Sequence, residues 1–281
     1  MHLTQTKNAL LTLLASWKAK GSVALVPTMG ALHKGHLSLV SKAVAENDFV
    51  VVSIFVNPTQ FDNLEDLKKY PKTLSQDMEL LSTVHRDLLV FAPSVSEIYP
   101  NMVFSKNYDF GNLANVMEGR FRQGHFNGVG TVVEALLTLV MPERAYFGEK
   151  DFQQLQIIRR LTEIKVIPVE IVGCPIVREP SGLAMSSRNK RLSEPMRQKA
   201  GLIHKTLKTA KDKFGTKSAE QVKEWVRTQF ARHDGFQLEY IEITEEATLI
   251  PLQRKKQTEK YRAFIAVYVE GVRLIDNIAL N

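Results

Sequence analysis

Cysteine is almost missing from this sequence, because Cys174 is the only one in 281 residues. A single cysteine excludes an intrachain disulfide and fits a reducing compartment. It also leaves no cysteine spacing typical of a zinc site, and the seven histidines do not supply one instead. We therefore expect neither a disulfide-stabilised domain nor a zinc enzyme.

Long hydrophobic runs are missing as well. No apolar run approaches the ~20 residues needed to span a bilayer. Residues 1–20 have the apolar spacing of a helix but lack the small-residue cleavage site of a signal peptide. The hydrophobic content of 44% is enough for one large or two medium domains. We expect a cytoplasmic protein that has no membrane partner.

Negative charge is in deficit, and the formal net charge is +7. An excess of positive charge suits nucleic acids and small anionic substrates equally well. The basic residues of the C-terminal third are interspersed with acids, and no RNA-binding signature accompanies them. We interpret most of them as solvated surface and expect no nucleic-acid partner.

Short β-branched runs alternate with amphipathic runs over the first 175 residues. We predict strands at residues 23–26, 49–56, 88–91, 145–147 and 165–172. We predict helices between them at residues 37–44, 74–83, 129–141 and 152–163. This alternation is typical of an α/β fold with a Rossmann-like, doubly wound parallel sheet. Residues 1–175 are therefore predicted to form a domain that binds nucleotide and substrate.

The pattern changes after residue 175. Two helical segments, 194–214 and 219–233, precede three alternating strands at residues 236–244, 262–269 and 272–275. This order predicts a smaller α+β domain with an antiparallel sheet over residues 176–281. We expect it to act as a lid.

The most informative motif joins the first strand to the first crossover helix. It ends in His33-Lys34-Gly35-His36, where the helix begins. A helix N-terminus offers free N–H groups and partial positive charge, which suit a phosphate. The two imidazoles add donors that can be protonated as phosphate charge accumulates, and Gly35 permits close approach of a nucleotide. The motif predicts chemistry at the phosphates of ATP.

Two further segments carry groups that suit phosphate. Ser186, Ser187 and Arg188 follow the flexible Gly182, and hydroxyls and a guanidinium can hold phosphate oxygens in a closing loop. Gly148 precedes Lys150, a point charge for phosphate, and Asp151. Asp151 is either a helix N-cap or a Mg²⁺ ligand, and one residue can do both. His-x-Gly-His together with Ser-Ser-Arg-Asn resembles the signatures of the nucleotidylyltransferase superfamily.

A more specific resemblance covers residues 22–192. The motifs that carry it are Pro27-Thr28-Met29-Gly30-Ala31-Leu32-His33-Lys34-Gly35-His36, Phe55-Val56-Asn57-Pro58-Thr59-Gln60-Phe61, Gly124-His125-Phe126, Tyr146-Phe147-Gly148-Glu149-Lys150-Asp151 and Leu183-Ala184-Met185-Ser186-Ser187-Arg188-Asn189. In order and spacing they resemble the pantoate–β-alanine ligase (pantothenate synthetase) family. The resemblance implies that ATP and (R)-pantoate form pantoyl-adenylate with Mg²⁺. β-Alanine then attacks the adenylate to give pantothenate and AMP. It also implies a homodimer, for which residues 104–110 are expected to offer an edge strand.

Site residues follow from the resemblance position by position. The ATP site it implies comprises Met29, Gly30, Ala31, Leu32, His33, Lys34, Gly35, His36, Gly148, Glu149, Lys150, Asp151, Val177, Met185, Ser186, Ser187 and Arg188. The expected catalytic residues are His36, as proton donor, with His33, Lys150, Ser186, Ser187 and Arg188. Gln60 and Gln154 match the pantoate contacts, and Gln60 is shared with β-alanine. Asp151 is the expected Mg²⁺ ligand.

Two departures from the family pattern and two alternatives remain at this point. Gln123 replaces a usual proline, which predicts a less rigid loop, and residues 62–67 replace a segment that often contains glycine. Another adenylyl- or cytidylyltransferase would share the two signatures but would not need Gln60 or Gln154. A tRNA-binding protein derived from a synthetase fits the charge but lacks a recognisable anticodon domain.

Overall fold

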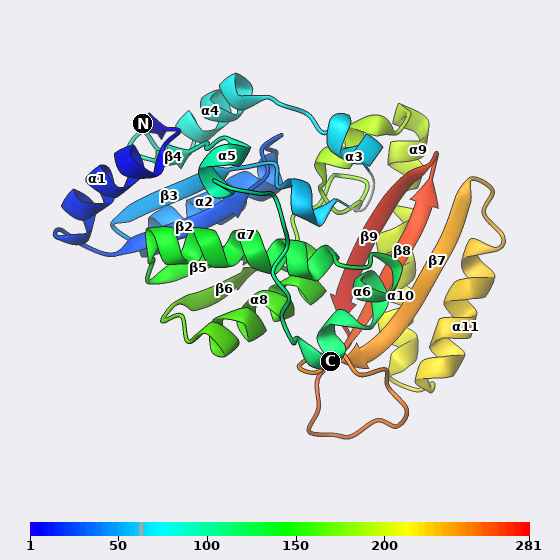
Figure 1. Ribbon diagram of the computed structural model, residues 1–281. Coiled ribbons are helices and arrows are strands. Elements are labelled where there is room, and N and C mark those ends of the chain that lie inside the picture. Colours follow the sequence, from blue (N-terminus) through cyan, green and yellow to red (C-terminus); the bar gives the residue numbers. More distant parts are fainter. Residues whose placement is uncertain (62–63) are drawn as a thin grey trace.

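The fold consists of two sheets, each with its own helices. A computed structural model describes residues 1–61 and 64–281. Figure 1 shows the larger sheet, with helices on both of its faces, beside a smaller sheet backed by helices. This arrangement of one parallel and one antiparallel sheet confirms the predicted fold class.

The larger sheet has six strands among the described residues, in the order β1-β4-β3-β2-β5-β6. All of its printed pairings are parallel. The strands are β1 (His2–Thr4), β2 (Val23–Thr28), β3 (Phe49–Ile54), β4 (Leu89–Phe91), β5 (Arg144–Gly148) and β6 (Glu170–Cys174). β3 and β2 lie at the centre, and the order reverses direction between β2 and β5. Ligands of such sheets bind beyond the carboxyl ends of the strands at this point.

Alternate residues of each strand point to opposite faces, so each face has its own core. Val23 and Leu25 of β2 pack with α1, α7 and α8, whereas Ala24 and Val26 pack with α2 and α4. The helices of this part are α1 (Lys7–Lys18), α2 (Lys34–Glu46), α3 (Leu64–Lys68), α4 (Leu74–Ser82), α5 (Val95–Ile98), α6 (Met117–Phe121), α7 (His125–Val140) and α8 (Phe152–Lys165). Short 3₁₀ turns follow three strands or loops: η1 (Pro58–Gln60), η2 (Gly111–Ala114) and η3 (Glu149–Asp151).

The smaller sheet is antiparallel, in the order β7-β8-β9. Its elements are η4 (Ser187–Arg191), α9 (Glu194–Lys199), α10 (Leu202–Phe214), α11 (Ala219–Phe230), β7 (Phe236–Glu245), β8 (Tyr261–Val269) and β9 (Val272–Ala279). Helices α10 and α11 cover one face and form a second hydrophobic core with it. The other face lies against the larger unit, and Phe264 of β8 packs near Phe152 of α8.

A buried ionic network joins the two units. Arg273 of β9 forms two hydrogen bonds with Glu118 of α6, of 2.6 and 2.8 Å. The Tyr240 hydroxyl donates a third at 2.8 Å. Glu118 is only 7% exposed, and although burial by itself would raise its pKa, the Arg273 guanidinium helps to hold that pKa below the usual range. The hydrogen bonds that compensate this carboxylate thus come from the second unit.

Four element predictions need correction. The N-terminal helix begins only at Lys7, because His2–Thr4 pairs with β4 as an edge strand. Helix α8 extends to Lys165 and ends at Val166 (φ 50°), so the next strand begins at Glu170 rather than at 165. The predicted helix 194–214 is broken at Gly201, where a Cβ would lie 2.0 Å from the Ser181 carbonyl oxygen.

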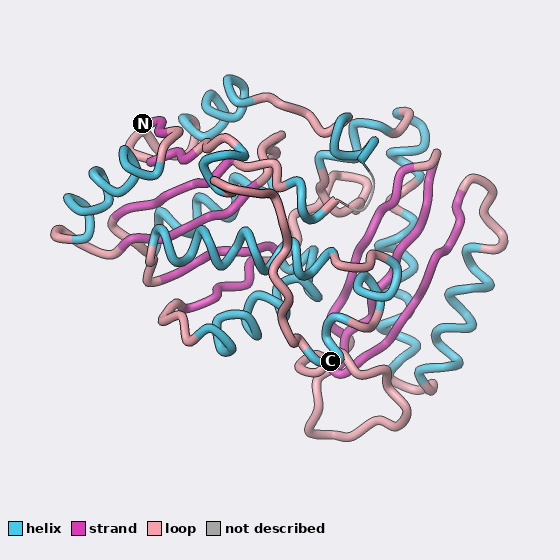
Figure 2. The backbone as a smooth tube through the Cα atoms, viewed as in Figure 1, coloured by secondary structure: helices cyan, strands magenta, loops and turns pink. Residues whose placement is uncertain are grey.

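The fourth correction concerns residues 104–110, which form no strand. Figure 2 shows the connection from α5 to α6 as a long loop that crosses α7. The Lys106 N–H bonds the Thr131 hydroxyl and the Tyr108 N–H bonds the Asn127 side chain, so the loop is tied to a helix instead of to a sheet. In the described part of the chain, no helix is both long and apolar enough to cross a membrane.

Candidate active site

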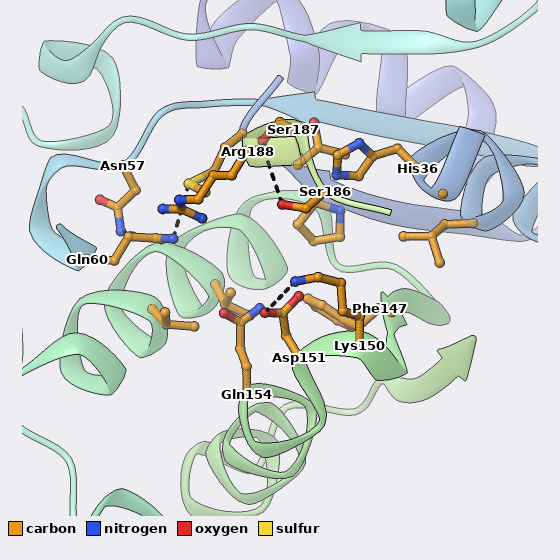
Figure 3. A pocket seen from close by; sticks show the side chains of 18 of the residues that line it. His36, Asn57, Gln60, Phe147, Lys150, Asp151, Gln154, Ser186, Ser187 and Arg188 are labelled. Atoms are coloured by element: carbon orange, nitrogen blue, oxygen red, sulfur yellow. Dashed lines mark hydrogen bonds and ion pairs between the residues drawn. The ribbon is translucent and has the colours of Figure 1, made fainter. Parts of the chain in front are cut away.

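The main cleft lies where the β2, β3 and β5 strands end, and the smaller unit closes one side of it. Figure 3 shows His36 with Ser186, Ser187 and Arg188 above the cleft, Lys150, Asp151 and Gln154 below it, and Asn57 and Gln60 at one end. Polypeptide segments far apart in the sequence therefore meet in one cavity. Its place matches the expected ligand position of a doubly wound sheet.

The loop from Met29 to His36 is shaped by two successive left-handed residues. Gly30 has φ 78° and Ala31 has φ 50°, and the N–H groups of Ala31 and Leu32 donate to the buried Asp77 carboxylate. These N–H groups consequently point away from the cleft. At position 35, a Cβ would lie 2.9 Å from the His33 ring, so glycine is required there for packing within the loop itself.

The two histidines stack with ring centroids 4.0 Å apart. His33 is the N-cap of α2, because its Nδ1 accepts the Gly35 N–H at 3.1 Å. The neutral ring must then carry its proton on Nε2. Burial, with Lys150 and Lys190 nearby, lowers the pKa of His33 to about 4. Burial, with His33 and Lys150, lowers the pKa of His36 to about 3. Both rings are therefore neutral near pH 7 while the cleft holds no anion.

Lys150 and Asp151 follow the end of β5 through the turn η3. The Lys150 ammonium lies 3.6 Å from the Asp151 carboxylate. The Asp151 side chain makes no cap hydrogen bond to α8 and is 47% exposed. Of the two roles considered for Asp151, the helix cap is thus not made. The space around the Cα of Gly148 is open, since a Cβ there would meet nothing within 4 Å.

The loop that carries Ser186, Ser187 and Arg188 is held in place by hydrogen bonds within the smaller unit. The Met185 N–H bonds the Val177 carbonyl, and Asn189 donates to Glu179 at 2.7 Å. Arg178, which precedes this loop, donates hydrogen bonds of 2.6 and 3.0 Å to Asp276 of β9. The hydrogen bonds that fix this loop are therefore made within the second unit.

That loop contacts the larger unit at Asp66 and Tyr70. Arg188 donates to Asp66 of α3 at 2.8 Å, and Arg191 donates to the other oxygen at 2.9 Å. Partial burial opposes ionisation of Asp66, but these two guanidinium groups hold its pKa below the usual range. Burial raises the pKa of the Tyr70 hydroxyl, which also bonds Ser187. The guanidinium groups of Arg188 and Arg191 thus place positive charge at the mouth of the cleft, where both are paired with Asp66.

The neighbours of the Gln60 side chain fix the positions of its amide oxygen and its amide nitrogen. Its Oε1 accepts from Asn57 at 3.1 Å, and its Nε2 points to the Met29 sulfur at 3.1 Å. Asn57 is itself fixed, because the Tyr99 hydroxyl donates to its oxygen at 2.7 Å. Helix α7 can approach this turn closely since Gly128 has no Cβ, which would lie 2.2 Å from the Thr59 carbonyl oxygen. Gln60 therefore offers N–H donors, which suit the carboxylate and hydroxyl oxygens of a small acid.

Most of the predicted site residues line this cleft. They are Met29, His33, Gly35, His36, Gln60, Gly148, Lys150, Asp151, Gln154, Val177, Met185, Ser186, Ser187 and Arg188. The predicted residues that the structure does not place in its lining are Gly30, Ala31, Leu32, Lys34 and Glu149. The Gly30–Leu32 turn faces Asp77, and Lys34 is exposed.

The structure adds lining residues that were not predicted as site residues, including Asn57, Tyr70, Arg122 and His125. Arg122 and His125 both bond the Gln60 carbonyl, at 3.3 and 2.8 Å. Their Gly-flanked position before a helix was a signal for an anion contact or a structural loop. No feature of the sequence marks Tyr70.

Comparison with known proteins gives one consistent result. A family model described as pantoate-beta-alanine ligase matches residues 2–279. A pantothenate synthetase of Christiangramia forsetii is 55% identical over 282 residues, with both chains fully covered. One from Flavobacterium psychrophilum is 53% identical over 92% of each chain.

Solved structures agree. The crystal structure of pantothenate synthetase from Thermus thermophilus superimposes with a TM-score of 0.89 at 40% identity, covering 100% of this chain and 99% of that one. The pantoate-beta-alanine ligase of Francisella tularensis, complexed with beta-gamma ATP and beta-alanine, gives a TM-score of 0.81 at 36% identity, covering 100% and 98%.

Proposed function

The chain belongs to the pantoate-beta-alanine ligase family, and from this premise we propose how its cleft carries out the reaction. The enzyme joins pantoate and β-alanine to form pantothenate in an ATP-dependent ligation. A carboxylate is a poor electrophile, so it must first receive a good leaving group. In the proposed first step, the pantoate carboxylate attacks the α-phosphorus of ATP and pyrophosphate leaves. In the second, the β-alanine amine attacks the acyl carbon and AMP leaves.

The observation that carries this proposal is that one cleft contains both cationic groups that suit a triphosphate and uncharged donors that suit a small acid. Lys150, Arg188 and the two histidines supply positive charge and donors for a triphosphate. Gln60 and Gln154, in the same cleft, supply uncharged donors for the acid. The protein need only align the carboxylate with the phosphorus and neutralise charge that develops in the transition state. Binding of the triphosphate raises the pKa of His36, so that this ring gains a donor when charge accumulates, while His33 already donates from Nε2.

Mg²⁺ is proposed to accompany ATP, with Asp151 as its protein ligand. No group of three or more potential metal-ligating side chains occurs in residues 1–61 and 64–281. The Asp151 carboxylate is 47% exposed and makes no cap hydrogen bond, which fits an ion that takes its other ligands from phosphates and water, as Mg²⁺ commonly does. The ion would shield the charge of the triphosphate there.

Three further proposals concern the smaller unit, the cellular compartment and the oligomeric state. The smaller unit, residues 176–281, acts as a lid that keeps water from the adenylate. The enzyme is cytoplasmic, where its single buried thiol stays reduced. It forms a homodimer through the loop around residues 102–104, where Met102, Val103 and Phe104 are 69, 46 and 51% exposed. A Phe104→Asp variant that stays dimeric in sedimentation would contradict this contact.

Pyrophosphate release tests the central proposal. With ATP, Mg²⁺ and pantoate, one equivalent of pyrophosphate per site is expected in a burst without β-alanine, and steady turnover with AMP and pantothenate when β-alanine is added. Pyrophosphate release that does not depend on pantoate, or that begins only with β-alanine, would contradict an adenylate formed first.

A further inference from the structure

The buried carboxylate of Asp77 has no role in the reaction described so far. It lies in the first turn of α4 and is 1% exposed. One oxygen accepts the Leu32 N–H at 2.7 Å, and the other accepts the Ala31 N–H at 3.0 Å and the Thr73 hydroxyl at 3.2 Å. Within the described residues it forms no ion pair with a basic side chain. Its charge is therefore compensated by backbone N–H groups and by the start of a helix.

The backbone that Asp77 holds is strained. Ala31 has φ 50°, a conformation that residues with a Cβ rarely adopt, and it follows Gly30 at φ 78°. Strained residues persist only when their surroundings fix them. Successive N–H groups in such turns form a concave anion site, and here the anion is an internal carboxylate rather than a phosphate. The packing is close, since a Cβ at Gly30 would lie 3.1 Å from an Asp77 oxygen.

The turn leads directly into the two histidines. Leu32 is followed by His33, whose ring caps α2 and stacks on His36. We propose that Asp77 is a positioning residue for adenylation: its two carboxylate oxygens lock the Gly30–Leu32 turn and thereby set His33 and His36 at the phosphate side of the cleft. This inference rests on the proposed role of those histidines.

The chemistry of the site requires two acceptors at once. An asparagine at position 77 has one acceptor oxygen and one NH₂ group. In either orientation, its NH₂ faces the N–H of Ala31 or of Leu32, so one loop hydrogen bond is lost. The side chain keeps its volume, and the change is therefore confined to the turn and its direction.

The experiment compares Asp77→Asn with the control Thr73→Val, measured by pyrophosphate release and by NMR titration of the histidines in the ligand-free protein. Thr73→Val removes the third hydrogen bond to the same carboxylate and leaves both loop bonds. For Asp77→Asn, kcat is expected to fall by about tenfold to a hundredfold, because small misplacements of catalytic groups have effects of this size. The pantoate KM should change by less than about threefold, because Gln60 is untouched. Thr73→Val should stay within about twofold of wild type in both, because both loop bonds remain.

The titration separates positioning from simple charge. Loss of a nearby negative charge would lower the pKa of His33 and His36 further, whereas a loosened turn exposes the rings and raises both values toward the ordinary one. We expect the rise. Wild-type kcat in folded Asp77→Asn, equal losses in both variants, or a lowered histidine pKa would each overturn the proposal.

Two provisions keep the test decisive. If Asp77→Asn does not fold, Asp77→Glu retains the charge and both oxygens but moves them by one methylene, and the same loss of kcat is expected; wild-type kcat there would overturn the proposal. If His36→Ala retained full activity, the histidine role itself would be wrong, while the NMR result would still report whether Asp77 sets the rings.

Discussion

The two loops that we expect to bind the phosphates of ATP, Met29–His36 and the loop with Ser186 and Arg188, are held in different ways. The Met29–His36 loop is fixed inside its own unit by Asp77, a buried carboxylate bonded to two of its N–H groups. The loop with Ser186 and Arg188 is braced by the smaller unit and reaches across the cleft to Asp66, whose side chain is 26% exposed. Buried contacts are costly to exchange, whereas a partly exposed ion pair is weak. We infer that the first loop is preorganised and that the second exchanges its carboxylate partner for phosphate.

The strongest test of the preorganised side is His36→Ala. The adenylation rate is expected to fall by about a hundredfold or more, since one donor to developing charge contributes ~3 kcal/mol to transition-state stabilisation. Pyrophosphate release at saturating ATP measures it. The control is His85→Ala, which alters a histidine outside the cleft. Turnover near the wild-type value would show that this loop does not act on the phosphates.

Gln60→Ala tests whether the acid side of the cleft is separate from the phosphate side. Removing the amide leaves a buried substrate oxygen unpaired, which costs roughly 1–3 kcal/mol. The kcat/KM for pantoate should fall accordingly, while the KM for ATP stays unchanged. Steady-state kinetics with each substrate varied gives both values. A rise in the ATP KM at constant pantoate KM would reverse the assignment.

The two partly buried histidines make the stability of the preorganised loop depend on pH. Both pKa values are lowered in the folded protein, to about 4 and about 3. The unfolded chain therefore binds more protons below about pH 6.5, and stability that is complete above that pH is lost as the pH falls toward 4. The loss is at most about 1.4 kcal/mol per pH unit and per histidine. Urea unfolding at pH 7 and pH 5 should show a smaller difference for His33→Ala than for wild type. Identical differences would mean that the rings titrate normally.

The smallest effect is expected for Asp66→Asn, which removes the carboxylate partner of Arg188. Removing the carboxylate frees Arg188 and Arg191, so the KM for ATP should fall by a few-fold, within the ~1 kcal/mol typical of exposed ion pairs. Glu65→Gln on the same short helix, whose side chain is 75% exposed, is the control. A raised ATP KM would indicate that Asp66 holds Arg188 in place for ATP instead of competing with it.

Much of this organisation could be predicted from the sequence. Hydrophobic alternation predicted the parallel sheet, and His36, Gln60 and Lys150 could be placed together because parallel strands end at one edge. What could not be predicted rests on contacts between distant residues. The strand His2–Thr4 is formed only by pairing with β4, and its three residues carry no pattern of their own. Gly201 stands at the break in the predicted helix, and the carbonyl of Ser181 leaves no room for a Cβ there.

The same limit applies within the site. The family resemblance implied that residues 30–32 belong to the ATP site, whereas Asp77, far along the chain, takes the N–H groups of Ala31 and Leu32. The segment that replaces the family's glycine-containing stretch includes residues 62–63, which lie outside the described residues. Beyond them, Asp66 is the residue that bonds Arg188. Gln123 is exposed, and no contact explains its replacement of proline.

The Glu118 network has a consequence for cutting the chain in two. The polypeptide passes from one sheet to the other near residue 175, which looks like a natural place to separate two fragments. Yet residues 1–175 alone would lose Arg273 and Tyr240, the hydrogen-bond partners of Glu118 from the other half, and the carboxylate would become exposed to water. Phe152 would likewise lose its neighbour Phe264. Each half therefore carries a recognition surface for the other, and co-expressed halves are expected to reassemble into an active split enzyme.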